Sequence, residues 1–201
     1  LRSRSAQLDE ATRTAIINDI EQESDRLFRM VENLLSMAHI EFTEDTAVEP
    51  VLAQRLLERV ILAFKQRRPD RVVNLDVEPG LEALAAEPTY LEQVVRNLLS
   101  NADKYSPTDT TVDIAVAREG NEAAIRVRDH GVGIEPDEAE RIFERFYRSE
   151  RTSKLVGGSG VGLALCKRLV EAMSGRMWAK PQPEGGLEVG FPLPLYEETR
   201  S

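Results

Sequence analysis

The sequence predicts an α+β fold in which one long helix precedes a domain that mixes helices with β-strands. Residues 14–41 repeat apolar side chains at steps of three, four and seven, which is the period of a helix with a narrow apolar seam. Residues 91–105 show a broader apolar face at helical spacing. Residues 111–117 and 122–128 have the pattern of adjacent antiparallel strands joined by a Glu-Gly-Asn turn.

The composition is that of a soluble globular protein: 41% of the 201 residues are hydrophobic, 30% are charged, and no apolar run could span a membrane. The net charge of −9 argues against a nucleic-acid binder, so a polyanion such as ATP would need local positive groups, a helix N-terminus or a metal ion. The single cysteine, Cys166, excludes an internal disulfide and a cysteine-based zinc site. Because residues 1–10 are polar and resemble no signal peptide, we expect a cytoplasmic location, whether or not upstream segments anchor a parent protein in the inner membrane.

The long helix at residues 14–41 contains neither glycine nor proline, and alone it would be only marginally stable. Its narrow seam needs partner helices, so we expect a bundle and a homodimer through this helix. His39, near its end, is interpreted as a surface or packing residue. The acidic, polar residues 42–49 mark a boundary, which predicts two domains at residues 1–45 and 46–201.

The shorter elements follow from local periodicity and turn residues. Before the central helix we expect a helix at residues 51–66, a strand at 72–77 and a short strand at 83–86. Pro88 opens the first turn of helix 91–105, and Ser106-Pro107 ends it. After the strand pair we expect a short helix from residue 136 or 137 to 143, an aperiodic mobile loop at 145–156, a helix at 163–173, and strands at 176–180 and 187–193.

Asn97, Asn101 and Lys104 fall together on one flank of the central helix, at spacings of four and three. Asparagine is a costly choice inside a helix, because its short amide competes for the backbone. Amide oxygens are hard ligands that Mg²⁺ accepts, and a lysine suits a phosphate as a point charge. The pattern therefore indicates a site for Mg²⁺ and phosphate, and it is equally compatible with a core helix whose flank is incidentally polar.

A glycine-rich run at residues 157–162 precedes the last helix, where backbone N–H groups and the helix dipole favour a phosphate. It is no Walker loop, because Gly-Lys-Ser/Thr is absent, and no dinucleotide fingerprint, because Leu163 stands where the third glycine should be. A flexible hinge is the alternative interpretation.

Asp129 directly follows a predicted strand, and Gly131 and Gly133 come after it. A carboxylate at a strand end can accept a hydrogen bond from the exocyclic amine of a base, while glycines let the chain turn close beneath the ring. A plain turn would look the same in isolation. The order of the asparagine helix, the Asp-x-Gly-x-Gly loop and the glycine-rich helix start within one domain favours a nucleotide site.

These segments resemble the motifs of sensor histidine kinases. The N box is matched by residues 97–106, the first glycine box by 129–134, the F box by 142–146 and the second glycine box by 157–163. Their order and spacing match across about residues 48–193, and the set is highly specific. The resemblance implies a Bergerat (GHKL) ATP-binding fold, a mixed sheet backed by helices, and it identifies helix 14–41 with the second helix of the dimerisation and phosphotransfer hairpin.

The resemblance also implies residue roles. Asn97 and Asn101 would hold the Mg²⁺ that bridges the ATP phosphates, and Lys104 and Tyr105 would touch those phosphates. Asp129 would accept from the adenine amine. The pocket would be shaped by Gly131, Gly133 and Ile134, and the lid hinge and helix start would be formed by Gly158, Gly160, Val161, Gly162 and Leu163.

Residues 148–156 would form a lid that orders with nucleotide, and Arg145 or Arg148 would reach the γ-phosphate, with Arg145 counted in the catalytic set beside Asn97 and Lys104. His130 stands where the family commonly has asparagine, which predicts a titratable ring against the bound base. His39 lacks the acidic neighbour of the family's phosphoacceptor histidine, so we expect that acceptor to lie outside this chain.

The resemblance thus predicts the catalytic part of an ATP-dependent protein histidine kinase, with ATP and Mg²⁺ as ligands. Its partner would be the receiver domain of a response regulator, and nucleic acid would not bind. One alternative is an ATPase clamp of the same fold, although those enzymes carry a glutamate four residues before the metal-binding asparagine, where this chain has Asn97. The other alternative is a nucleotide-gated binding module without catalysis.

Overall fold

The structure, a computed structural model, describes residues 47–153 and 157–197, together with residues 12–14, 16, 17, 20, 24, 27 and 31. The described positions between residues 12 and 31 are helical, as predicted for this stretch. His39, the boundary between residues 45 and 46, and residues 154–156 of the predicted loop lie outside the described residues. The division into two domains therefore stays a prediction.

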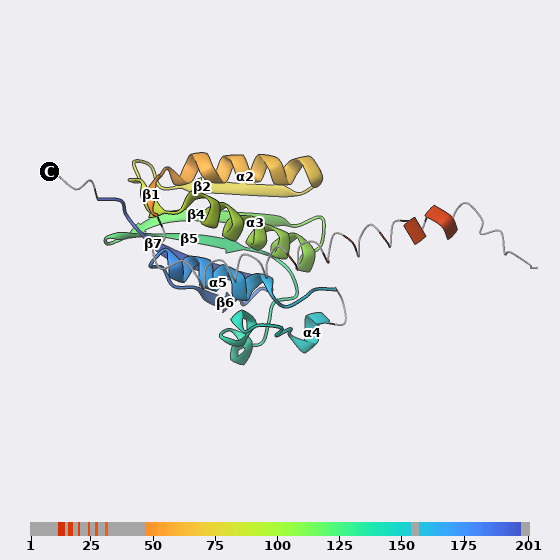
Figure 1. The fold of residues 1–201 in the computed structure, drawn as a ribbon. Helices are drawn as coiled ribbons and strands as arrows, with labels where there is room; N and C mark the ends of the chain where they lie inside the picture. The colour runs from red at the N-terminus through yellow and green to blue at the C-terminus, as the bar shows by residue number, and fades with distance from the viewer. Residues whose placement is uncertain are drawn as a thin grey trace, which may run out of the picture.

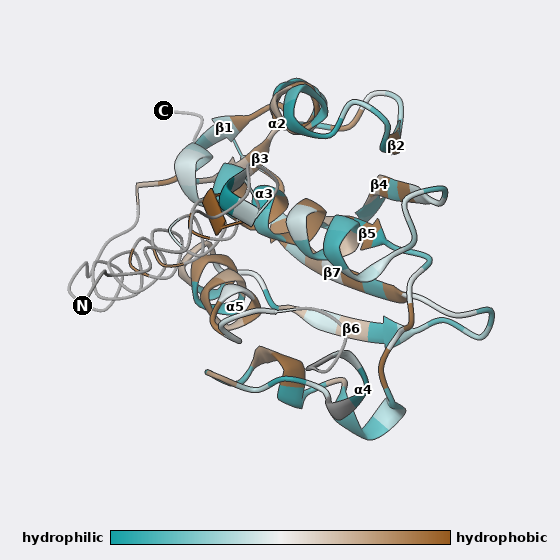
Figure 2. Ribbon diagram, turned by 90° about the vertical axis from the view of Figure 1, so that its right-hand side faces the viewer, coloured by the Kyte–Doolittle hydropathy of each residue, from teal (hydrophilic) through white to brown (hydrophobic). Residues whose placement is uncertain are grey.

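Five strands form a mixed sheet in the order β2-β4-β5-β7-β6. Their bounds are β2 (Val72–Val77), β4 (Thr111–Glu119), β5 (Glu122–Arg128), β6 (Trp178–Pro181) and β7 (Leu187–Pro194). β2 runs parallel to β4, and the other neighbouring strands are antiparallel. Three helices, α2 (Ala53–Arg67), α3 (Pro88–Tyr105) and α5 (Gly162–Ala172), cover one face of this sheet (Figures 1 and 2). The predicted α+β class, with a mixed sheet backed by helices, is confirmed.

α3 is the helix that the rest of the domain packs around, since it contacts α2, α5, β4 and β5. Its N-terminus is capped by the Glu87 carboxylate, which accepts from the N–H groups of Thr89 (3.0 Å) and Tyr90 (2.6 Å). Its apolar face is buried through Leu91, Val94, Val95, Leu98, Leu99 and Ala102. Each buried Leu or Val contributes roughly 1.5–3 kcal/mol relative to an exposed one, so tertiary packing fixes this helix.

A second sheet of two short strands pairs β1 (Glu49–Val51) with β3 (Leu84–Ala86) in antiparallel register. β3 agrees with the strand predicted at residues 83–86. β1 lies in and next to the stretch interpreted as a boundary and was not predicted. It is three residues long and contains Pro50, so it has neither the length nor the alternation by which strands are recognised.

Residues 136–153 differ from the prediction in detail. The helix expected up to residue 143 consists of two 3₁₀ turns, η1 (Pro136–Glu138) and η2 (Arg141–Phe143), and the expected loop contains the short helix α4 (Glu150–Ser153). Only Ile142 and Phe143 are buried apolar residues in this stretch, which is too little apolar surface to support a longer helix.

Candidate functional site

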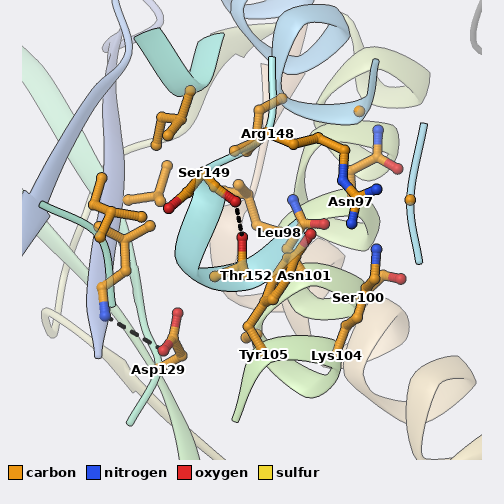
Figure 3. Close-up of a pocket in the computed structure, with 18 of the residues that line it drawn as sticks. Asn97, Leu98, Ser100, Asn101, Lys104, Tyr105, Asp129, Arg148, Ser149 and Thr152 are labelled. Atoms are coloured by element: carbon orange, nitrogen blue, oxygen red, sulfur yellow. Dashed lines mark hydrogen bonds between the residues drawn. The ribbon is translucent and has the colours of Figure 1, made fainter. Parts of the chain in front are cut away.

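A cavity of about 490 Å³ lies between the C-terminal half of α3, the ends of β5 and β7, and the segments on either side of residues 154–156 (Figure 3). A volume of this size is typical of a small-molecule site. Most of the residues selected from the sequence line it: Asn97, Asn101, Lys104, Tyr105, Asp129, Gly133, Ile134, Gly158, Gly160, Gly162 and Leu163. Gly131, Val161 and Arg145 do not line it. Gly131 adjoins the cavity, and Val161 is buried in the core.

One wall of the cavity carries the two amides of α3. Asn97 and Asn101 are one helical turn apart and both line the cavity, and a hydrogen bond from the Asn97 side chain partly opposes the rise that burial causes in the pKa of the Cys166 thiol. An amide N–H group donates and cannot ligate a cation, so a metal here would be held by the two amide oxygens. The described residues contain no group of three His, Cys, Asp or Glu side chains that could hold a metal by themselves. Two neutral amide oxygens fit Mg²⁺, which usually takes few protein ligands and fills its shell with phosphate oxygens and water.

Lys104 is held one turn further along α3. Its Nζ lies 4.9 Å from the centroid of the Tyr105 ring, a cation–π contact. A Cβ added to Gly158 would lie 2.5 Å from this Nζ, so the glycine-rich run packs directly against the ammonium group. A side chain at residue 158 would displace the flexible end of Lys104.

Asp129 lies at the other end of the cavity from Asn97 (Figure 3). Its Oδ1 accepts from the N–H groups of Gly131 (2.8 Å) and Leu187 (3.3 Å), and its own N–H donates to the Leu187 carbonyl (2.9 Å). Burial raises the pKa of Asp129 above its usual value, and these hydrogen bonds only partly oppose the rise. The carboxylate is therefore a fixed, poorly solvated acceptor at the end of β5.

Two glycines allow the loop after Asp129 to lie where it does. A side chain on Gly131 would overlap the Tyr105 carbonyl group, so the loop touches the end of α3. Gly186, in the turn between β6 and β7, has a φ of +91°, and its Cβ would overlap the carbonyl of Asp129. The sequence predicts no role for Gly186 in the site. Its adjacent glycine was the available signal, but the contact with Asp129 depends on the sheet order.

Two arginines were candidates for the phosphate end, and the structure places them differently. Arg145 is exposed and lies outside the cavity lining, whereas Arg148 is half-buried, lines the cavity and extends toward Asn97 (Figure 3). Burial raises the pKa of Tyr105, and the positive charge of Arg148 opposes that rise, so the two side chains are close. Of the two arginines, only Arg148 lines the cavity.

His130 does not line the cavity, contrary to the expectation that its ring would lie against a base. Its Nε2 is 2.9 Å from Oδ2 of Asp113 on β4. Burial tends to raise the pKa of Asp113, but hydrogen bonds with His130, Asn74 and Thr111 outweigh it, so the pKa lies below its usual value. His130 directly follows Asp129, and consecutive side chains of an extended chain point to opposite sides. The His130 ring therefore points to Asp113 on β4, while the Asp129 carboxylate lines the cavity.

Comparison with known proteins identifies the family. The model of a family described as histidine kinase-, DNA gyrase B-, and HSP90-like ATPase matches residues 86–197, so this chain belongs to that family and carries its ATP-binding domain. The chain is 33% identical to the sensor histidine kinase CpxA of Escherichia coli K12 in an alignment of 202 positions, which covers 99% of this chain and 42% of CpxA. The resemblance to histidine kinases seen in the sequence is confirmed.

Solved structures of histidine kinases share the fold. The mycobacterial sensor histidine kinase MprB matches with a TM-score of 0.66 and 28% identity, covering 75% of this chain and 99% of that chain. Full-length ShkA in complex with AMPPNP matches with a TM-score of 0.75 and 25% identity, covering 96% of this chain and 41% of that chain. The chain thus spans less than half the length of CpxA or ShkA.

Proposed function

We propose that this chain is the catalytic, ATP-binding part of a sensor histidine kinase, which transfers the γ-phosphoryl group of ATP to a histidine. One observation carries the choice of a kinase over a hydrolase. Among the described residues, Asp129 is the only acidic side chain that lines the cavity, and it lies at the end away from Asn97 and Lys104. An ATPase needs a base to activate water near the γ-phosphate, and the described lining of the cavity offers no carboxylate there.

The cavity residues suit the binding of Mg-ATP. Asp129 accepts from the adenine amine, a role that fits the complex of ShkA with AMPPNP as a nucleotide of the same base. Lys104 and Arg148 neutralise the phosphates at the other end. Asn97 and Asn101 would hold Mg²⁺, which would supply positive charge beside the phosphates. Phosphoryl transfer depends mainly on positioning and charge neutralisation, and these residues provide both.

The acceptor histidine is supplied from outside this chain. His130 is engaged with Asp113 away from the cavity, and an attacking nitrogen must come within about 3–3.5 Å of the γ-phosphorus. The phosphoryl group would then pass to an aspartate in the receiver domain of a response regulator, which fits the shared fold with the histidine kinase ThkA, solved in complex with the response regulator protein TrrA.

The N-terminal helix forms a dimer with a second copy of the chain. Its described apolar residues are between 41% and 60% exposed: Ile16, Ile17, Ile20, Leu27 and Val31. Large apolar side chains at this spacing need a partner helix, so residues 1–45 belong to the dimerisation hairpin and residues 46–201 to the catalytic domain. Among the described residues, no helix combines the length and apolar character required to cross a membrane.

The decisive experiment incubates the chain with Mg²⁺ and γ-radiolabelled ATP, with and without the histidine-bearing hairpin of a sensor kinase such as CpxA. We expect acid-labile label on the supplied hairpin and none on the chain alone. Asn101→Ala should abolish the labelling, and Arg96→Ala, on the exposed flank of α3, should not.

Each alternative has its own outcome. Steady release of inorganic phosphate without labelled protein would favour the ATPase clamp. Nucleotide binding with neither release nor label would favour a binding module. Acid-labile label on the isolated chain that is lost in His39→Ala would contradict an external acceptor.

A further inference from the structure

Glu138 is a buried carboxylate that the proposed chemistry does not yet use. It ends η1, is 8% exposed, and accepts three hydrogen bonds. The donors are the Glu135 N–H (2.9 Å), the Ser149 hydroxyl (2.9 Å) and the Tyr147 hydroxyl (2.8 Å). Burial tends to raise the pKa of Glu138, but these hydrogen bonds and the nearby Arg141 outweigh it and lower the pKa, so the group is ionised at neutral pH.

Two of these donors stand on either side of Arg148. Tyr147 binds one carboxylate oxygen of Glu138 and Ser149 binds the other, so both neighbours of the arginine are tied to a single group. Ser149 is 4% exposed and also lines the cavity, and its carbonyl accepts from the Thr152 N–H (3.2 Å) at the start of α4. The backbone on both sides of Arg148 is therefore fixed while the side chain projects into the cavity.

Further contacts brace the same turn. The Arg141 guanidinium stacks on the Tyr147 ring at 4.5 Å, and the Phe146 N–H donates to the Gly160 carbonyl at 2.9 Å. Glu135, which donates its N–H to Glu138, also pairs with Arg151 at 2.8 Å. Glu138 thus joins the end of the loop that begins at Asp129 to the segment that carries Arg148.

We propose that Glu138 is a positioning residue, which directs Arg148 at the terminal phosphate by holding Tyr147 and Ser149 on its two carboxylate oxygens. The proposal rests on the proposed function, because it needs a nucleotide phosphate for Arg148 to meet. A residue needed only for folding would affect all ligands alike. A positioning residue should matter for ligands that reach Arg148 and only while Arg148 is present.

The test measures the affinities of AMPPNP with Mg²⁺ and of adenosine for the wild type, Glu138→Ala, Arg148→Ala and the double variant by titration calorimetry. Glu138→Ala should weaken AMPPNP about tenfold and leave adenosine within twofold. In the Arg148→Ala background the same substitution should have no further effect on AMPPNP, which is the signature of action through Arg148. Glu138→Gln, which keeps one oxygen acceptor, should recover part of the loss. Glu144→Ala, an exposed carboxylate in the same segment, is the matched control and should change nothing.

Several results would overturn the proposal: an undiminished AMPPNP affinity in Glu138→Ala, an equal loss for adenosine, or a loss of the same size without Arg148. If Glu138→Ala does not fold, Tyr147→Phe and Ser149→Ala remove the same bonds from the donor side and should show the same selective loss. Failure of the wild type to bind AMPPNP would instead count against the proposed function.

Discussion

α3 and the segment at residues 135–153, called the rim here, border the same cavity but are held in place by different forces. α3 is anchored by six buried apolar residues and by a capped N-terminus. The rim has two 3₁₀ turns and one four-residue helix, and its order depends on hydrogen bonds to Glu138. Phe146 on the rim is 62% exposed with a φ of +67°, a conformation that is costly for a bulky residue.

The C-terminal end of α3 is fixed as firmly as its core. Arg71 is 3% exposed and donates to the Asp103 carboxylate (2.8 Å), the Asp103 carbonyl (2.9 Å) and the Ser106 carbonyl (3.2 Å). A buried arginine at this end satisfies carbonyls that the helix leaves unpaired. Lys104 and Tyr105, which belong to the same turn, are therefore held before any ligand arrives.

This contrast separates two tasks. The residues proposed for adenine and for the metal are on elements fixed by packing, which favours specific recognition at little ordering cost. Arg148, one of the two cations proposed for the phosphates, is on the rim, which can open locally without unfolding the domain. We therefore expect nucleotide to order the rim further while α3 stays unchanged.

Hydrogen exchange should show the largest difference between α3 and the rim. Amides of residues 94–102 should exchange only through global unfolding, about 10³-fold more slowly than those of residues 138–152, which open locally. AMPPNP with Mg²⁺ should slow the rim amides and leave the α3 amides nearly unchanged. Mass spectrometry of the exchanging chain measures both. Equal protection of α3 and the rim from exchange in the free chain would contradict the proposed difference in their local stability.

Asn101→Ala should weaken Mg-AMPPNP about 10–100-fold, because a hydrogen bond or ligand to a charged group is worth roughly 1.5–3 kcal/mol. The melting temperature should change little, since the side chain faces the cavity and not the core. Calorimetric titration with Mg²⁺ and with EDTA measures the effect. Equal affinity of the wild type in EDTA would rule out a metal role for Asn97 and Asn101.

Asp129→Asn should weaken AMPPNP about tenfold and reduce its advantage over the guanine analogue, since an amide is a weaker acceptor than a carboxylate. The same change should stabilise the free chain near pH 7. Burial raises the pKa of Asp129 in the folded chain. The stability that this carboxyl group contributes to the wild type is therefore complete below its pKa in the unfolded chain, and it is lost as pH rises through its pKa in the folded chain. The melting temperature of Asp129→Asn relative to wild type should thus rise between pH 4 and pH 7. A difference that does not vary with pH would contradict this reasoning.

The elements with sustained periodicity could be predicted from the sequence, and the short ones could not. The apolar face of α3 and the alternation of β4 each extend over seven or more residues, so their positions follow from local pattern. β1, α4 and the two 3₁₀ turns have three or four residues each, too few for any period to show. Their conformation depends on partners outside the element itself, such as β3 for β1 and Glu138 for the turn that carries Arg148.

The site could be predicted as a set, but not the direction of each side chain. Asn97, Asn101 and Lys104 are on a helix, whose geometry places them on one flank. Arg145 and Arg148 are on an aperiodic segment, where no spacing rule states which of the two faces the cavity. The contact of Gly186 with Asp129 requires β7 to lie beside β5, and this pairing of strands is not visible in local sequence.

The smallest effect is expected for His130→Asn, which tests whether closeness in sequence to Asp129 is enough to affect the ligand. The ring pairs with Asp113, and both side chains are about one-third exposed (35% and 38%), so the pair contributes at most about 0.5 kcal/mol. AMPPNP affinity should stay within twofold, because the ring does not line the cavity. At pH values above the usual pKa of aspartate, the variant should be slightly less stable than the wild type. The lowered pKa of Asp113 contributes stability there that disappears as pH falls through the folded value, so wild type and variant should converge in acid. A fall of tenfold or more in AMPPNP affinity, with the melting temperature unchanged, would indicate that His130 contacts the nucleotide.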